Sequence, residues 1–235
     1  MEKAHLRTPH FSCNPKSYLW GEDLHRLADK AEECAVKYDL DCIFTAQLID
    51  LPYIIQNCPH LTPCAQMIDP IEPGRGMGFV LPEALAAAGV KVAFINHAEK
   101  PRTLHEIAAS IQRCREVGIL SFVASDTVEE ARAVASLHPD LMVCELTSLI
   151  GTGQVADESY MRESREAVKA IDPNILVHQG AGIHCGDDVY ETVMRGADGT
   201  GATSGIVCAP DPLAMIDEMM AAMARARDDL AKQKA

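Results

Sequence analysis

Eight short apolar runs, separated by longer amphipathic stretches, constrain the fold of this 235-residue chain more than any other feature. Each run has the length of a strand, and most are rich in β-branched residues. The runs cover residues 10–14, 41–47, 61–66, 90–96, 118–125, 140–145, 174–180 and 197–203. The last run is the weakest strand prediction, because Gly199 and Gly201 lower strand propensity.

The segments between the runs have helical periodicity. Apolar residues recur at three- and four-residue spacing in segments 21–39, 103–118, 126–140, 157–173 and 211–233. Gly118 suits a C-terminal cap, and Asp126 with Glu129 three residues later predicts a capped helix start. Strand alternating with helix predicts a parallel sheet with right-handed crossovers.

Eight such units leave about 29 residues each, near the size of one βα unit. No linker rich in Pro, Gly or Ser divides the chain. We therefore expect one α/β domain over residues 1–235, folded as a closed (β/α)₈ barrel. An open, doubly wound sheet is the alternative.

Charge and composition exclude several classes of function. The net charge of −13 opposes a nucleic-acid partner. No run reaches the roughly 18 apolar residues of a membrane span, and residues 1–10 lack the apolar core of a secretory signal, so we expect no membrane partner. Nine scattered cysteines without a C-x-x-C pair favour reduced thiols in the cytoplasm over a disulfide framework or zinc ribbon.

In such a barrel, function lies on the loops after the carboxyl ends of the strands. Lys16 follows the first run and suits a phosphate or a developing oxyanion, although a solvated loop lysine is the favoured interpretation of this residue taken alone. His97 follows the fourth run near an expected helix start at Thr103, where the helix terminus favours a neutral imidazole that can donate to a carbonyl. A structural histidine is the alternative. We expect Glu99 to pair with Lys16 or Lys100.

The later strand ends carry a carboxylate and several small residues. Glu145 ends the sixth run, where partial desolvation suits a general base. The following segment 146–153 ends in Gly-Thr-Gly and predicts either a loop that closes over a ligand or a plain connection. Segments 180–183 and 201–205, Gly-Ala-Gly-Ile and Gly-Ala-Thr-Ser-Gly, predict a phosphate cradle. Neither matches G-x-G-x-x-G, which disfavours a dinucleotide site.

Together these motifs resemble the triosephosphate isomerase family, and in particular its short archaeal-type branch. The resemblance follows chain order from the first strand to the eighth and covers essentially the whole chain. The matching pieces are Asn14-x-Lys16, Asn96-His97-x-Glu99, Glu145 ahead of Leu149-Ile150-Gly151-Thr152-Gly153, Gly180-Ala181-Gly182-Ile183 and Ala202-Thr203-Ser204-Gly205.

This resemblance implies a TIM barrel that interconverts glyceraldehyde 3-phosphate and dihydroxyacetone phosphate through an enediolate, in glycolysis and gluconeogenesis. It implies that Glu145 is the base, His97 the electrophile and Lys16 the charge stabiliser. The substrate and its phosphate would be bound by Asn14, Lys16, Ile150, Gly151, Gly182, Thr203 and Ser204. The resemblance implies no metal or organic cofactor, a small phosphosugar as the substrate, and a homodimer or homotetramer.

The chain also departs from the family pattern. Leu146 replaces the proline that usually follows the catalytic glutamate, Ala98 replaces a serine, and segment 70–78 differs from the usual third loop. Two alternatives therefore stay open: an isomerase of another short phosphosugar, such as a tetrulose phosphate, and a phosphosugar-binding homologue without useful turnover. A Schiff-base aldolase is disfavoured, since Lys16 begins a loop that looks exposed. The methionines within segment 217–226 indicate a buried face, either in an oligomer or against the barrel itself.

Overall fold

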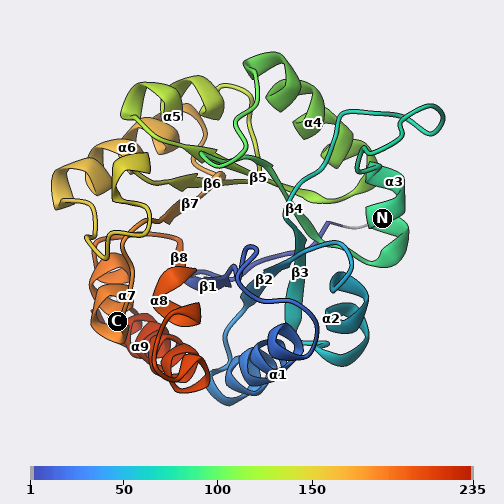
Figure 1. The fold of residues 1–235 in the computed structure, drawn as a ribbon. Helices are drawn as coiled ribbons and strands as arrows, with labels where there is room; N and C mark the ends of the chain where they lie inside the picture. Colours follow the sequence, from blue (N-terminus) through green and yellow to red (C-terminus); the bar gives the residue numbers. More distant parts are fainter. Residues whose placement is uncertain (1–2, 234–235) are drawn as a thin grey trace.

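A computed structural model describes residues 3–233 and places all eight apolar runs in one closed barrel (Figure 1). Each strand is parallel to its neighbours, and β1 pairs with β8 through His10 and Gly199, which closes the ring and excludes the open sheet. The strands are β1 (His10–Cys13), β2 (Cys42–Ala46), β3 (Leu61–Ala65), β4 (Val92–Asn96), β5 (Leu120–Ser125), β6 (Leu141–Cys144), β7 (Leu176–Gln179) and β8 (Gly199–Ala202). The eight strand predictions are confirmed to within two residues at each end.

Helices surround the barrel (Figure 1). They are α1 (Gly21–Tyr38), α2 (Leu51–Asn57), α3 (Pro82–Ala88), α4 (Leu104–Val117), α5 (Val128–Ala135), α6 (Glu158–Ile171), α7 (Gly186–Met194), α8 (Ser204–Val207) and α9 (Pro212–Gln233). The five periodic segments correspond to α1, α4, α5, α6 and α9. Periodicity did not mark α2, α3, α7 or α8, because helices of four to nine residues make at most about two and a half turns and cannot display a long apolar stripe.

Helix caps agree with the sequence at one helix and differ at another. Thr103 and Glu106 form a reciprocal capping box at α4, and Gly118 ends that helix in the left-handed region at φ 78°. The predicted cap at Asp126 is wrong: Thr127 caps α5 by accepting a hydrogen bond from the backbone N–H of Glu130 at 3.1 Å. The carboxylate of Asp126 instead accepts from the N–H of Thr147, in the loop after β6, at 3.0 Å.

The inside of the barrel is uneven in polarity. Apolar side chains of β2 to β6 fill one side, with Phe94 stacked on Phe122 at 4.3 Å between ring centroids. Where β7, β8 and β1 meet, the interior holds the imidazoles of His10 and His178. The glycine-rich strand β8 leaves room for them, because Gly199 has no side chain.

The last helix packs on its own barrel. Met219, Met220 and Met223 of α9 are completely buried within one chain, and α9 lies between α7 and α1 (Figure 1). These methionines therefore do not indicate an oligomer surface. In the described part of the chain, no helix combines the length and the apolar character needed to cross a bilayer.

Candidate active site

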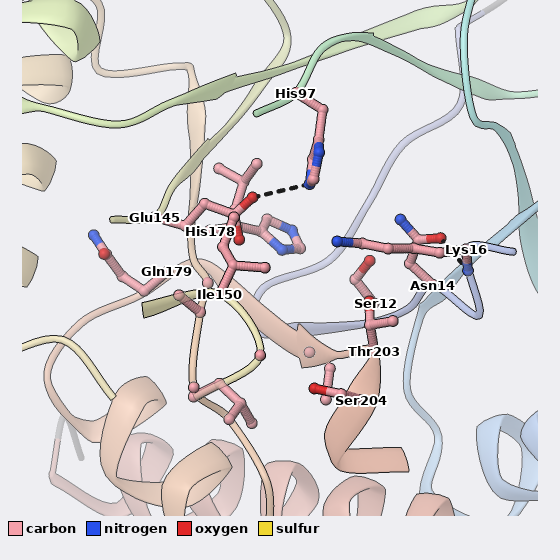
Figure 2. Close-up of a pocket in the computed structure, with 18 of the residues that line it drawn as sticks. Ser12, Asn14, Lys16, His97, Glu145, Ile150, His178, Gln179, Thr203 and Ser204 are labelled. Atoms are coloured by element: carbon pink, nitrogen blue, oxygen red, sulfur yellow. Dashed lines mark hydrogen bonds and ion pairs between the residues drawn. The ribbon is translucent and has the colours of Figure 1, made fainter. Parts of the chain in front are cut away.

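All nine predicted site residues line one pocket at the carboxyl ends of the strands (Figure 2). They come from the loops after β1, β4, β6, β7 and β8, which meet at this mouth because the strands are parallel. The nine are Asn14, Lys16, His97, Glu145, Ile150, Gly151, Gly182, Thr203 and Ser204.

Glu145 and His97 face one another across the pocket (Figure 2). Glu145 Oε1 lies 3.2 Å from His97 Nε2, and the side chains are only 14% and 15% exposed. His97 Nδ1 accepts a hydrogen bond from the backbone N–H of Glu99 at 3.1 Å. An accepting Nδ1 means that the imidazole is neutral and that Nε2 carries the proton. The ring therefore presents a neutral N–H donor to the pocket.

Gly180 makes room for the carboxylate. A Cβ at this position would lie 2.8 Å from Glu145 Oε2 and 2.9 Å from a methyl of Val143. The glycine after β7 thus allows the Glu145 side chain to lie over the end of the neighbouring strand.

Lys16 is held at the opposite side of the pocket. Its side chain is only 16% exposed, so a solvated loop lysine is the wrong interpretation, although the same loop exposes Tyr18 and Trp20. The ammonium contacts Glu99 Oε1 at 2.8 Å, which confirms the expected pairing and selects Lys16 over Lys100. The backbone of Lys16 is left-handed at φ 48°, and the side chain of Asn14 accepts from its N–H at 3.0 Å. Burial opposes ionisation of Glu99, but Lys16 outweighs it and holds the pKa of Glu99 below its usual value.

The loop after β6 rests on the loop after β7. It begins with a 3₁₀ turn, η1 (Thr147–Leu149), and continues through Gly151 at φ 76°. A Cβ on Gly182 would lie 1.9 Å from the carbonyl oxygen of Gln154. Only glycine permits this approach, so Gly182 couples the two loops that face the candidate phosphate site.

Small residues form the remaining wall of the pocket. Thr203 precedes the single turn α8, and the first N–H groups of a helix have no acceptor within it. A Cβ on Gly205 would lie 2.4 Å from the carbonyl oxygen of Ile183, so the loops after β7 and β8 touch here. Backbone N–H groups can therefore approach an anion without interference from side chains.

The polar residues Ser12 and His178 also line the pocket, and sequence reasoning missed them. His178 lies two residues before Gly180 and Ser12 lies two residues before Asn14, so strand alternation places each on the inner face. Two-residue periodicity counted backward from the predicted site would have found both.

One group among residues 3–233 has the donor atoms of a metal site, but it lies outside the pocket. His184, Cys185 and Asp188 meet at the start of α7. Asp188 already accepts hydrogen bonds there from the backbone N–H groups of His184 and Cys185, at 3.0 and 3.2 Å. This carboxylate therefore serves as a helix cap.

Comparison with known proteins agrees with the geometry. The family model described as triosephosphate isomerase matches residues 11–219. The triosephosphate isomerase of Methanothermus fervidus is 34% identical over 206 residues, covering 86% of this chain and 92% of the relative. That of Methanobrevibacter smithii is 36% identical over 212 residues, covering 88% of this chain and 95% of the relative. That of Sulfolobus acidocaldarius is 30% identical over 219 residues, covering 92% of this chain and 95% of the relative.

Proposed function

Since the chain belongs to the triosephosphate isomerase family, we propose that it interconverts glyceraldehyde 3-phosphate and dihydroxyacetone phosphate. The observation that carries the proposal is the pairing of Glu145 with the neutral N–H of His97 at 3.2 Å inside a pocket walled by small residues. A carboxylate base and a neutral hydrogen-bond donor on one substrate are what proton transfer next to a carbonyl requires.

In this mechanism Glu145 removes the proton from the carbon next to the carbonyl. The electrons of the broken C–H bond form the enediolate, and Nε2–H of His97 donates to the oxygen where negative charge develops. Glu145 then returns the proton to the neighbouring carbon, while His97 passes a proton from the hydroxyl oxygen to the former carbonyl oxygen. The carbonyl and hydroxyl thus exchange places and neither side chain is consumed. The ammonium of Lys16 stabilises the charged intermediate from the other side of the pocket.

The phosphate would be held mainly by backbone groups. Lys16 is the one lysine or arginine lining the pocket among residues 3–233, and the chain carries a net charge of −13. The N–H groups at Gly182 and at the start of α8, with Thr203 and Ser204, supply the remaining positive potential. Closure of segment 146–153 would exclude water from the enediolate.

A coupled assay tests this proposal. Glyceraldehyde 3-phosphate and a four-carbon aldose phosphate are each supplied to the wild-type protein, and kcat/KM is compared. We expect higher kcat/KM for the three-carbon substrate. A higher kcat/KM for the four-carbon sugar would show that the protein is instead an isomerase of another short phosphosugar. Binding of inorganic phosphate without turnover of either sugar would assign a binding protein.

We also propose a homo-oligomer in the cytoplasm. Apolar side chains are exposed on three successive loops at the mouth of the barrel, after β1, β2 and β3. They are Tyr18, Trp20, Leu48, Ile49, Met77 and Phe79. Such a surface suits a second copy of the chain. The cytoplasm is supported by nine free cysteines, seven of them buried.

A further inference from the structure

A buried pair of histidines lies at the floor of the pocket, and the mechanism above makes no use of it. His10 begins β1 and is completely buried, while His178 of β7 is 2% exposed. Their Nε2 atoms are 2.5 Å apart, although the residues are 168 positions apart in the chain. Interiors of such barrels are dominated by branched apolar side chains, so two imidazoles here call for an explanation.

The strand between the two histidines is built to let them meet. Gly199 of β8 is the pairing partner of His10 on one side and of His178 on the other. A Cβ on Gly199 would lie 2.5 Å from His178 Nε2 and 2.8 Å from the carbonyl oxygen of His10. Any other residue at this position would clash with the imidazole of His178 and with the backbone of His10.

A chain of hydrogen bonds determines which nitrogens carry protons. His10 Nδ1 donates to the carbonyl oxygen of Arg7 at 3.2 Å. Burial lowers the pKa of His10 to about 4 and that of His178 well below its usual value, so both rings are neutral. His10 Nε2 therefore accepts, and His178 Nε2–H donates to it. This leaves Nδ1 of His178 as an unprotonated acceptor.

That acceptor is available to a ligand. His178 lines the pocket, and in Figure 2 its ring is seen between the side chains of Glu145 and Lys16. Among residues 3–233, Nδ1 of His178 has no hydrogen-bond partner, and it is not among the polar atoms that are sealed from solvent. A neutral lone pair suits a hydroxyl donor and does not suit a phosphate oxygen, which is itself an acceptor.

We propose that Nδ1 of His178 accepts a hydrogen bond from a hydroxyl group of the bound phosphosugar. His178 is then a specificity-determining residue, and His10 is a positioning residue that holds its tautomer. The inference rests on the proposed function for the identity of the ligand. Beyond the proposed function, we infer that the site prefers phosphosugars that carry a hydroxyl group at this point. An analogue without that hydroxyl would leave Nδ1 of His178 unpaired.

Two variants of His178 distinguish its nitrogens. In His178→Asn the amide oxygen is bonded to Cγ, as Nδ1 is, while His178→Gln places its polar atoms near the position of Nε2. Calorimetry gives the ratio of Kd for propyl phosphate to Kd for glycerol 3-phosphate, two ligands that differ in their hydroxyls. We expect this ratio to fall roughly 3- to 10-fold in His178→Gln, because one hydrogen bond to the ligand is lost. The ratio should fall less in His178→Asn, because an acceptor remains near the position of Nδ1. Equal ratios in wild type and both variants, or an equal fall in both variants, would overturn the inference.

The wild-type protein provides a test that does not depend on the folding of a variant. With ¹⁵N-labelled imidazoles, we expect Nδ1 of His178 to be unprotonated and its signal to move when glycerol 3-phosphate is added, but not when propyl phosphate is added. His10→Gln, which keeps an acceptor near Nε2, should preserve the His178 tautomer, whereas His10→Leu should not. An Nδ1 signal unmoved by glycerol 3-phosphate would refute the hydrogen bond. The titration measures binding without turnover. Absence of isomerase activity would therefore contradict the proposed function, whereas the hydrogen bond to His178 would still be decided by the titration alone.

Discussion

Single hydrogen bonds set the chemical character of the candidate site. The backbone N–H of Glu99 donates to one nitrogen of His97 and so directs the proton of the other nitrogen toward Glu145. Lys16 is likewise held by Glu99 and by its own left-handed backbone. Each reactive group is thus oriented by a neighbour before any substrate enters, which lowers the cost of orienting it during the reaction.

At this scale we predict the effect of Glu145→Gln. The amide keeps the size of the side chain but cannot accept the proton, so kcat should fall by about 10²- to 10⁴-fold. The inhibition constant of inorganic phosphate should change by less than about twofold, because the base acts on carbon and not on the phosphate. Steady-state kinetics measure both quantities. Retention of wild-type kcat would show that another residue is the base.

At the scale of elements, the loop after β6 accommodates the missing proline. Leu146 has φ −69°, close to the angle that proline requires. Its N–H makes no hydrogen bond within the described residues, whereas the next N–H, that of Thr147, donates to Asp126 at 3.0 Å. The two neighbouring positions should therefore respond differently to the same substitution.

We predict that Leu146→Pro folds normally and gains up to about 1 kcal/mol in unfolding free energy, since proline restricts the unfolded chain. A stiffer hinge should also change kcat or product release severalfold. Thr147→Pro is the matched control and should lose about 1 kcal/mol or more, because it removes the bond to Asp126. Denaturant titration and pre-steady-state kinetics report the two effects. Identical kinetics in Leu146→Pro and wild type would mean that the hinge does not limit the reaction.

A second element-scale feature is the connection between α1 and α9. Asp217 of α9 accepts hydrogen bonds from the hydroxyl of Tyr38 at 2.6 Å and from the ammonium of Lys37 at 3.1 Å, both on α1. The Tyr38 hydroxyl, with Lys37 and Lys30, lowers the pKa of Asp217 to about 2 from its ordinary 3.8. Because the pKa of Asp217 is lower in the folded than in the unfolded protein, its carboxylate stabilises the fold at a pH where the group is ionised in both the folded and the unfolded protein. This stabilisation is lost as the pH falls from about 4 to about 2.

We therefore predict that Asp217→Asn loses roughly 1 kcal/mol of unfolding free energy at pH 7, after allowing for partial exposure of the group. The difference from wild type should shrink as the pH falls through that interval. Asp39→Asn is the control, since its carboxylate is 80% exposed and a surface pair contributes little. Chemical denaturation at several pH values measures both. A pH-independent difference would show that the hydrogen bond to Tyr38 acts without the charge.

At the scale of the whole molecule, exposed apolar side chains are concentrated on one part of the barrel mouth. Met77 is fully exposed in the segment between β3 and α3, which reaches outward beside α3 in Figure 1, and Ile49 is 84% exposed after β2. Segment 70–78, where the chain departs from the family pattern, is part of this surface. A homo-oligomer would cover these side chains.

We predict that the double variant Ile49→Lys/Met77→Lys has a lower molar mass in solution than wild type. Two lysines would place uncompensated charge in an apolar interface, which costs several kcal/mol. Val36→Lys on the outer face of α1, where the side chain is 57% exposed, is the control and should leave the mass unchanged. Light scattering after size exclusion gives the masses. A monomeric wild-type protein would contradict the proposed oligomer.

The sequence by itself determined the features that depend on local pattern. Alternation of apolar runs with amphipathic stretches predicted the barrel, because strand and helix periods are properties of neighbouring residues. The site residues could be brought together without coordinates, since each follows a strand and parallel strands end at one face. The helix start at Thr103 and the cap at Gly118 were readable for the same local reason.

Tertiary structure alone decided the contacts between distant segments. Closure of β8 onto β1 brings His10 to His178 over Gly199, and no local signal marks a partner 168 residues away. Packing within one chain, and not an oligomer, buries the methionines of α9, because burial depends on what lies opposite a helix face. Thr127, and not Asp126, caps α5, and the carboxylate of Asp126 accepts a hydrogen bond from the loop after β6. Pattern identifies which groups can interact, but the closed barrel determines which of them meet.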